Sequence, residues 1–172
     1  MSELLVIRHG QASFGAQNYD VLSDLGRAQA RAAGDWLRSM GWAPDRVITG
    51  SLNRQIDTAS EIGFAPSPET HDGLNEYDFS SLLDARFPDG LPDLVNADRK
   101  VHFRTLCETV FAWQRDEIAN PYETWEAFAT RVEAARAFAV ETDAKRVLVV
   151  SSGGVIGQMT AASLHAPVQH MM

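Results

Sequence analysis

The sequence predicts an α/β fold, a three-layer α/β/α sandwich built on a mostly parallel sheet. Two continuous apolar runs, at residues 4–7 and 147–150, are typical of strands that are buried on both faces of a sheet. Between these runs, apolar residues recur at helical spacing in several stretches. Alternation of strands with helices is the pattern that builds a parallel sheet.

The first half of the chain is predicted to run strand, helix, strand, helix. The first strand, Leu4–Ile7, stops abruptly at Arg8-His9-Gly10. Ser23 is well placed to cap a helix that ends at Gly41. Apolar residues recur every four positions along that helix, at Ala28, Ala32, Trp36 and Met40.

A second strand is expected at Val47-Ile48, followed by a helix from about Ser51 to Gly63. Residues 65–98 contain most of the prolines and several glycines. This composition favours active-site loops with no more than one short helix, which we regard as an insertion.

The second half is predicted to contain two long helices, a strand and a last helix. Pro121 separates the two long helical patterns, at 103–113 and 125–139. The run Val147–Val150 is the strongest strand signal of the chain and leads into Ser151-Ser152-Gly153-Gly154. The last helix is expected from about Val155 to Leu164.

Size and charge limit the classes of function. The 172 residues suit one domain, 1–172, and the formal net charge of -8 argues against nucleic acid as a partner. An anionic ligand must therefore be held by a local group of cations. The chain shows no signal-peptide pattern and no apolar stretch of about 20 residues, the length that crosses a membrane, so we expect a cytoplasmic protein.

Three predicted strands end in unusual residues, at 8–10, 49–51 and 151–154. Ligands of parallel sheets bind beyond the carboxyl ends of the strands, so these three ends are expected to meet at one crevice. Taken alone, Arg8-His9-Gly10 is equally consistent with a charged turn.

Arg54 makes an anion site the better interpretation. It lies in the first turn of its helix, where the helix dipole disfavours a cation. An anion bound there would resolve the conflict, because both the helix N-terminus and a guanidinium attract it. The alternative is a surface arginine that points into water.

Further motifs follow Val6-Ile7-Arg8-His9-Gly10-Gln11 in a fixed order. They are Leu22–Gly26 with Gln29-Ala30, Thr49–Arg54 with Thr58-Ala59, Leu74-Asn75-Glu76, and Val149–Ile156. Together they resemble the histidine phosphatase superfamily, which includes the cofactor-dependent phosphoglycerate mutases. The resemblance covers most of the chain and implies a phosphoglycerate mutase-like fold.

The resemblance implies that His9 attacks phosphorus, that Arg8 and Arg54 hold the phosphoryl oxygens, and that Glu76 gives a proton to the leaving alcohol. Two guanidinium groups beside His9 would lower its pKa and keep it neutral. Phosphoryl transfer needs mainly positioning and charge stabilisation, so neither a metal nor a cofactor is expected. Asp78 is a rival for the acid, because the usual glycine and tryptophan downstream are missing.

The main departure from the family is Ser152, which stands where its members carry a second histidine. A serine hydroxyl is neutral and donates a weaker hydrogen bond to a phosphoryl group. Removing one preorganised donor typically slows a reaction by about 10²–10³. His71 is the histidine best placed to compensate.

Other candidates for phosphate contacts are Ser13 and Gly153. Gly15 replaces an asparagine that many family members have near the phosphate, and Asn18 is a further substitute. Family members usually add another strand after the last helix, whereas this sequence stops at Met172, and the end is either natural or a truncation.

The sequence thus favours a metal-independent phosphatase that works through phospho-His9 and is slowed by Ser152. A catalytically impaired phospholigand-binding or regulatory domain is the alternative, and a phosphoglycerate mutase ranks third. The expected partner is a phosphorylated small molecule or a phosphoprotein, with no membrane. The oligomeric state and the substrate stay open.

Overall fold

A parallel sheet forms the centre of the molecule. The computed structural model describes residues 3–13, 20–65, 67–91 and 99–167. Its four-stranded sheet has the order β1-β4-β2-β3, with every neighbouring pair parallel. The strands are β1 (Glu3–Arg8), β2 (Arg46–Thr49), β3 (Glu69–Thr70) and β4 (Arg146–Ser151).

The strand β4 lies between β1 and β2 and is buried on both faces. Val147 and Val149 point into one hydrophobic core, while Leu148 and Val150 point into the other. Successive side chains of a strand face opposite ways, so a continuous apolar run is what a central strand requires. This is why 147–150 gave the clearest strand signal in the sequence.

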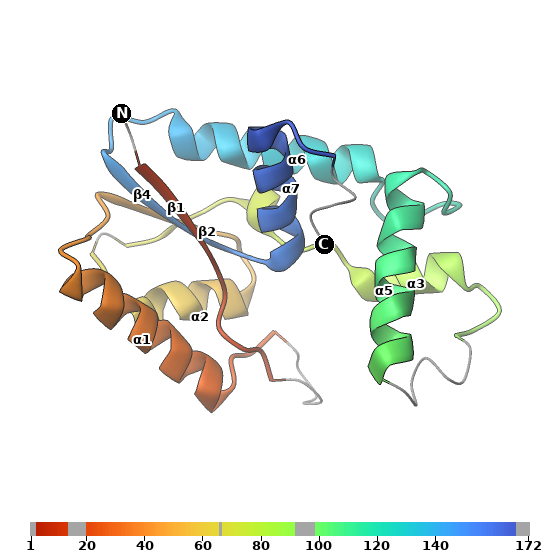
Figure 1. Cartoon of the computed structure of the whole chain (residues 1–172), viewed down its shortest axis with the longest axis horizontal. Helices are drawn as coiled ribbons and strands as arrows, with labels where there is room; N and C mark the ends of the chain where they lie inside the picture. The colour runs from red at the N-terminus through yellow and green to blue at the C-terminus, as the bar shows by residue number, and fades with distance from the viewer. Residues whose placement is uncertain (1–2, 14–19, 66, 92–98, 168–172) are drawn as a thin grey trace.

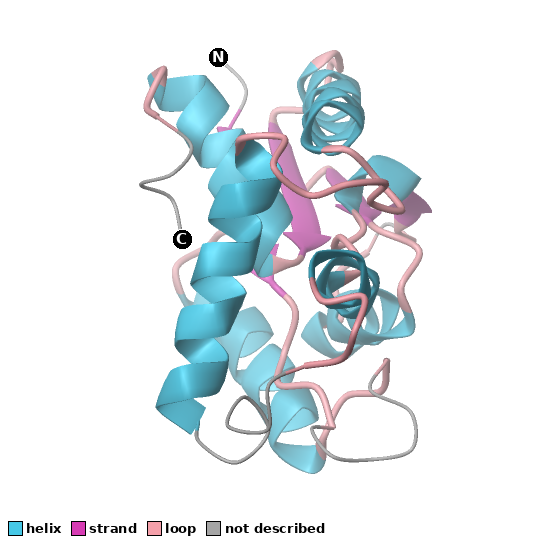
Figure 2. Ribbon diagram, turned by 90° about the vertical axis from the view of Figure 1, so that its right-hand side faces the viewer, coloured by secondary structure: helices cyan, strands magenta, loops and turns pink. Residues whose placement is uncertain are grey.

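Helices cover both faces of the sheet (Figures 1 and 2). The helices α1 (Asp24–Ser39) and α2 (Asn53–Ile62) pack on the core that contains Leu148. The helices α6 (Trp125–Val140) and α7 (Gly153–Leu164) pack on the other core. The prediction of a three-layer α/β/α fold with a parallel sheet is confirmed.

Two further helices, α3 (Phe79–Arg86) and α5 (Arg99–Gln114), pack against each other beside the layered body (Figure 1). The segment 65–98 contains the one short helix that the sequence analysis allows, α3, and is otherwise more regular than predicted. It supplies α3, the edge strand β3 and the 3-10 turn η1 (Asp72–Leu74). The strand β3 escaped prediction because it has only two residues, both exposed and polar. Residues 92–98 of this segment lie outside the described part of the chain.

The helix boundaries follow from local chemistry. The Ser23 hydroxyl accepts a hydrogen bond from the backbone N–H of Gly26 at 3.1 Å, which is the predicted cap of α1. The helix α7 begins at Gly153, two residues earlier than predicted. No helix among the described residues has the length and apolar character needed to cross a membrane.

Phe128 holds the second core together. Its side chain is fully buried, and its ring packs against those of Tyr77, Trp113 and Trp125 at centroid distances of 5.3–5.6 Å. We expect Phe128→Ala to lower the free energy of unfolding by about 3–5 kcal/mol, because it leaves a cavity in the core. Urea unfolding measures this, with Tyr122→Ala as the control. Tyr122 is 85% exposed, so its replacement should change stability by about 0.5 kcal/mol at most. Equal effects of the two changes would contradict this view of the core.

Candidate active site

The carboxyl ends of three strands meet at one edge of the sheet. The register pairs Arg8 with Ser151 and Thr49 with Val150, so the ends of β1, β2 and β4 are level. The backbone N–H of His9 donates to the carbonyl of Ser151 at 2.9 Å, one step beyond the paired strands. The residues that follow each strand therefore border the same space.

The loop after β1 is tied to α2. The backbone N–H of Gly10 donates to the Thr58 hydroxyl at 3.0 Å, and that hydroxyl donates to the carbonyl of Arg54 at 2.6 Å. A side chain at Gly10 would come within 2.3 Å of the Gly26 carbonyl oxygen, so only glycine allows α1 to approach this closely. Thr58 thus fixes His9 relative to the helix that carries Arg54.

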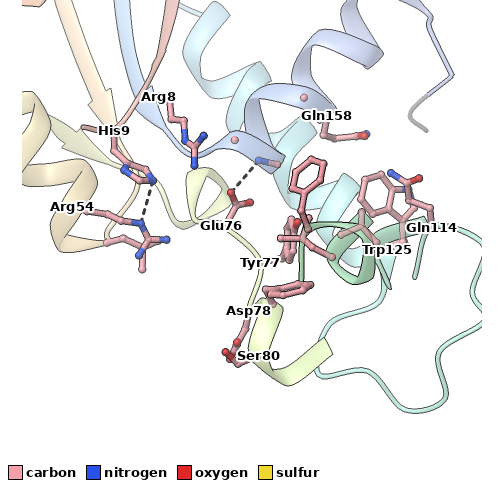
Figure 3. A pocket seen from close by; sticks show the side chains of 18 of the residues that line it. Arg8, His9, Arg54, Glu76, Tyr77, Asp78, Ser80, Gln114, Trp125 and Gln158 are labelled. Carbon is pink, nitrogen blue, oxygen red and sulfur yellow. Dashed lines mark hydrogen bonds between the residues drawn. The ribbon is translucent and has the colours of Figure 1, made fainter. Parts of the chain in front are cut away.

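The contact between His9 and Arg54 fixes the protonation of the imidazole. The Arg54 Nε donates to His9 Nε2 at 3.3 Å, and His9 Nδ1 lies 2.7 Å from the carbonyl oxygen of Gly10 (Figure 3). A guanidinium only donates, so Nε2 must be the acceptor and Nδ1 must carry the proton. Burial lowers the pKa of His9, as do the charges of Arg54 and Arg8, against the opposing effects of the Gly10 carbonyl and Asp20. The ring is held neutral, with a lone pair on Nε2.

Asp20 anchors Arg54 from the opposite side. Its carboxylate accepts from Arg54 Nη1 at 2.9 Å and from the backbone N–H of Asn53 at 2.8 Å. The residue at the N-cap of α2, Leu52, makes no capping hydrogen bond with its side chain. The carboxylate of Asp20 instead accepts from a backbone N–H at the start of this helix, which has no partner within the helix. The sequence analysis missed Asp20, because only the folded chain brings residues 20 and 54 together.

Arg8 lies on the other side of His9. Its guanidinium carbon is 3.8 Å from where a Cβ on Gly153 would stand, so it covers the start of α7. Within the described part of the chain, no carboxylate pairs with Arg8. Arg8 and Arg54 both lower the pKa of His9 and that of Glu76, so each arginine lies within electrostatic reach of both titratable side chains.

Glu76 is a buried carboxyl group at the start of α7. Its Oε2 accepts from the backbone N–H of Gly154 at 3.0 Å, and its Oε1 is buried without a hydrogen-bond partner among the described residues. A Cβ on Gly154 would come within 2.5 Å of that Oε1, so glycine is needed for this approach. Burial raises the pKa of Glu76, against the opposing backbone N–H groups of Gly154 and Tyr77 and the two arginines. The group therefore keeps its proton to higher pH than an ordinary glutamate.

Asp78, the rival acid, has the opposite chemistry. It caps α3 by accepting from the backbone N–H of Ser81 at 3.1 Å and from the Ser81 hydroxyl at 2.7 Å. Its side chain is exposed, and the Ser81 hydroxyl lowers its pKa most. An ionised, exposed cap is a poor proton donor, although Asp78 also lines the cavity.

The structure does not bring every predicted phosphate contact to the cavity. Ser152 is fully buried, and its hydroxyl oxygen accepts from Gln55 Nε2 at 2.8 Å, behind the cavity wall. Ser13 is half-buried, and its N–H donates to the Val21 carbonyl, away from the wall. Gly153 does line the cavity. Gly15 and Asn18 lie outside the described residues, as does the chain end from 168.

His71 does not take the place of the second histidine. Its ring packs on Phe138 at 5.1 Å, and its Nδ1 accepts from the backbone N–H of Gly73. His102, to which the sequence analysis assigns no role, lines the cavity beside Phe79. Its neighbours could not be foreseen, because they depend on how α5 packs on α3.

The cavity has a volume of about 860 Å³ and two unlike ends. Figure 3 shows Arg8, His9 and Arg54 at one end, aromatic side chains at the other, and Glu76 between them. Among the described residues, no group of three or more histidine, cysteine, aspartate or glutamate side chains is arranged to hold a metal ion. The site therefore offers two guanidinium groups, a neutral imidazole and a buried carboxyl group around a single space.

The fold is that of an α/β protein with cations, an imidazole and a carboxyl group gathered at one sheet edge, and the sequence comparison gives the family. Residues 4–172 match the histidine phosphatase superfamily (branch 1), and the chain belongs to this superfamily. Over 93 residues it is 34% identical to the 2,3-bisphosphoglycerate-dependent phosphoglycerate mutase of Sphingopyxis alaskensis. That stretch covers 48% of this chain and 41% of the mutase, so it spans less than half of the curated relative.

Solved structures agree with the fold. A mycobacterial glucosyl-3-phosphoglycerate phosphatase solved with VO3 is 27% identical, with a TM-score of 0.65 over 99% of this chain and 86% of that one. The alpha-ribazole phosphatase of Shigella flexneri is similar in fold, with a TM-score of 0.68, 22% identity, and coverage of 98% of this chain and 82% of that one.

The negative charge of Asp20 raises the pKa of His9, so removing that charge should lower it further. We expect Asp20→Asn to shift the His9 titration to lower pH in an NMR experiment. Asp57→Asn is the matched control, because Asp57 pairs with Arg27 on another side of α2 and has no part in the His9 shift. An unchanged or raised His9 pKa in Asp20→Asn would contradict the arrangement described.

Proposed function

We propose that the protein hydrolyses a phosphomonoester through a phosphohistidine at Nε2 of His9, without a metal ion. The observation that carries this proposal is the hydrogen bond from Arg54 to Nε2, which keeps the imidazole neutral beside two cations. A neutral imidazole is the nucleophilic form, and the nearby guanidinium groups attract the phosphoryl oxygens.

In the first step, the Arg54 Nε–H shifts its hydrogen bond from Nε2 of His9 to a phosphoryl oxygen. The freed Nε2 lone pair forms a bond to phosphorus while the bond from phosphorus to the ester oxygen breaks. Glu76 gives its proton to the departing oxygen, which leaves as an alcohol. In the second step, Glu76 as a carboxylate takes a proton from water, and the water oxygen attacks phosphorus. The bond to Nε2 breaks, inorganic phosphate leaves, and both residues return to their first state.

Arg8, Arg54 and the backbone at Gly153 are the proposed phosphoryl ligands. Phosphoryl transfer gains mostly from positioning and from stabilisation of the equatorial oxygens, and fixed guanidinium groups supply both. A mycobacterial glucosyl-3-phosphoglycerate phosphatase of similar fold, with 26% identity and a TM-score of 0.63, has been solved with inorganic phosphate, which supports phosphate as a ligand of this fold.

Glu76 is the proposed proton donor in preference to Asp78. Burial raises the pKa of Glu76 and so favours its protonated form, whereas the Ser81 hydroxyl lowers the pKa of Asp78 and favours its carboxylate. The pKa values of these two acids are shifted in opposite directions, and only a protonated acid can give a proton to the leaving group.

Ser152 supports a slower reaction and a second candidate function. Where the superfamily carries a second histidine, this chain offers a neutral hydroxyl that faces Gln55. The lost donor is expected to cost about 10²–10³ in rate. A domain that binds a phospholigand and hardly turns it over is therefore the second candidate. A mutase is less well supported, because the additional substrate-binding stretches of that branch were not found in the sequence.

The nucleophile is tested by trapping the intermediate. We expect acid-labile, alkali-stable phosphate on wild-type protein after a rapid quench, and none on His9→Ala, which should also lose turnover. His165→Asn is the control, because His165 ends α7 outside the cavity and asparagine tolerates its positive φ. Tight phosphate binding without turnover or phosphohistidine would favour the second candidate.

The proton donor is tested by varying the leaving group. We expect Glu76→Gln to slow hydrolysis of an alkyl phosphate by about 10²–10⁴ and to affect p-nitrophenyl phosphate far less, since nitrophenolate departs without a proton. Asp78→Asn should leave both reactions close to wild type, because asparagine also caps a helix.

The pH profile gives a second measure of the same residue. On the acid side kcat/KM should fall as His9 gains a proton, with a pKa below 6.5. On the basic side it should fall as Glu76 loses its proton, with a pKa above 4.5. Glu76→Gln should abolish the fall of kcat/KM at basic pH. Wild type and variant are compared on the same substrate, so the titration of the substrate affects both profiles equally. A basic fall that persists in Glu76→Gln and disappears in Asp78→Asn would reverse the assignment.

A further inference from the structure

Aromatic side chains from separate elements line the cavity, and they are those of Tyr77, Phe79, Phe103 and Trp125. Figure 3 shows Tyr77 and Trp125 on the side away from His9. Two of them are held rigidly, because Tyr77 packs 5.0 Å from Trp113 and Trp125 packs 5.0 Å edge-on to the same ring. Phe103 on α5 is 64% exposed, although it borders the cavity. Binding of a flat apolar group to such a surface is favourable, because it removes apolar area from water.

Two buried amide oxygens also lie in this part of the cavity wall. The Oε1 atoms of Gln114 on α5 and Gln158 on α7 are buried without a hydrogen-bond partner among the described residues. Both residues line the cavity, and both lie at its aromatic end (Figure 3). Unpaired buried acceptors are rare in folded proteins, and a ligand with N–H or O–H groups would satisfy these two.

The cations of the cavity wall are confined to the opposite end. Of the described residues that line the cavity, Arg8 and Arg54 are the ones with a permanent positive charge, and both lie beside His9. A ligand with a second phosphate or carboxylate at its far end would bury that charge against apolar rings, which is unfavourable. Among the described lining residues, the aromatic side therefore offers no permanent positive charge to a second phosphate or carboxylate.

From these three observations we infer that the substrate is a monophosphate ester whose alcohol carries an aromatic ring with hydrogen-bond donors. This inference rests on the proposed function for the position of the phosphate. With the phosphoryl group between Arg8 and Arg54, the ester oxygen faces Glu76, and the rest of the alcohol extends toward Trp125. A cavity of about 860 Å³ has room for such a ring system, whereas a three-carbon alcohol would leave most of it filled with water.

Three phosphate esters of primary alcohols test the inference on the unchanged protein, because each loses the same type of alkoxide oxygen. They are ethyl phosphate, 2-phenylethyl phosphate and 2-(indol-3-yl)ethyl phosphate. We expect kcat/KM to rise about tenfold or more from ethyl to phenylethyl, because the ring is buried, and again by several-fold for indole, whose N–H meets a glutamine oxygen. Equal values for ethyl and phenylethyl phosphate would overturn the inference.

Binding of non-hydrolysable analogues separates this inference from the proposed function. Calorimetry with propylphosphonate and 3-phenylpropylphosphonate measures the ring preference even if nothing is hydrolysed. A preference of about tenfold for the phenyl compound with no turnover of any ester would retain the ring site and refute the phosphatase. Turnover of all three esters at equal rates, with equal phosphonate affinities, would retain the phosphatase and refute the ring site.

Variants of residues that line the cavity test whether these side chains cause the preference for a ring. Phe103→Ala should reduce the phenylethyl-over-ethyl ratio of kcat/KM, with Tyr122→Ala as the matched control at an exposed aromatic outside the cavity. The double change Gln114→Leu/Gln158→Leu should bring the indole-over-phenyl ratio down to about one, because it removes both acceptors. An indole preference that survives the double change, or a phenyl preference equally reduced in Tyr122→Ala, would refute the proposed wall.

Discussion

The rest of the site depends on the hydrogen bond from Arg54 to Nε2 of His9. Because arginine can only donate, the imidazole must accept, and the carbonyl of Gly10 holds the proton on the other nitrogen. Burial and two positive charges then favour the neutral ring. The position of Arg54 is fixed in turn by Asp20 and by Thr58, which link it to the loops after β1. A parallel sheet makes this contact possible, since it places the ends of β1 and β4 beside the start of α2.

The two titratable groups of the site are shifted in opposite directions from their usual values. His9 loses its proton more readily than a free histidine, and Glu76 loses its proton less readily than a free glutamate. Burial is the first cause of both shifts, because it penalises the charged form of each group. A nucleophile needs the neutral state and an acid needs the protonated state, and burial at the same sheet edge favours both. The chain as a whole is acidic, so its attraction for an anion comes from the local guanidinium groups.

The sequence allowed prediction of features that follow from local pattern. The apolar run at 147–150 predicted the central strand, and Ser23 predicted the cap of α1. The conflict between the charge of Arg54 and the dipole of its helix predicted an anion-binding site. Asp20, Gln114, Gln158 and His102 could not be found in the same way, because their roles depend on neighbours far along the chain. Ser152 shows the limit most clearly. Its position in the motif suggested a phosphate contact, whereas the fold turns its hydroxyl toward Gln55, whose buried amide also holds the carbonyl of Leu74.

A crystal structure with bound vanadate would test the central claim most directly. A neutral His9 with its lone pair on Nε2 predicts a vanadium–Nε2 bond, with the oxygens of vanadate held by Arg8 and Arg54 and the hydrogen bond between Nδ1 and Gly10 intact. Vanadate bound through Nδ1, or bound away from His9 altogether, would contradict the account.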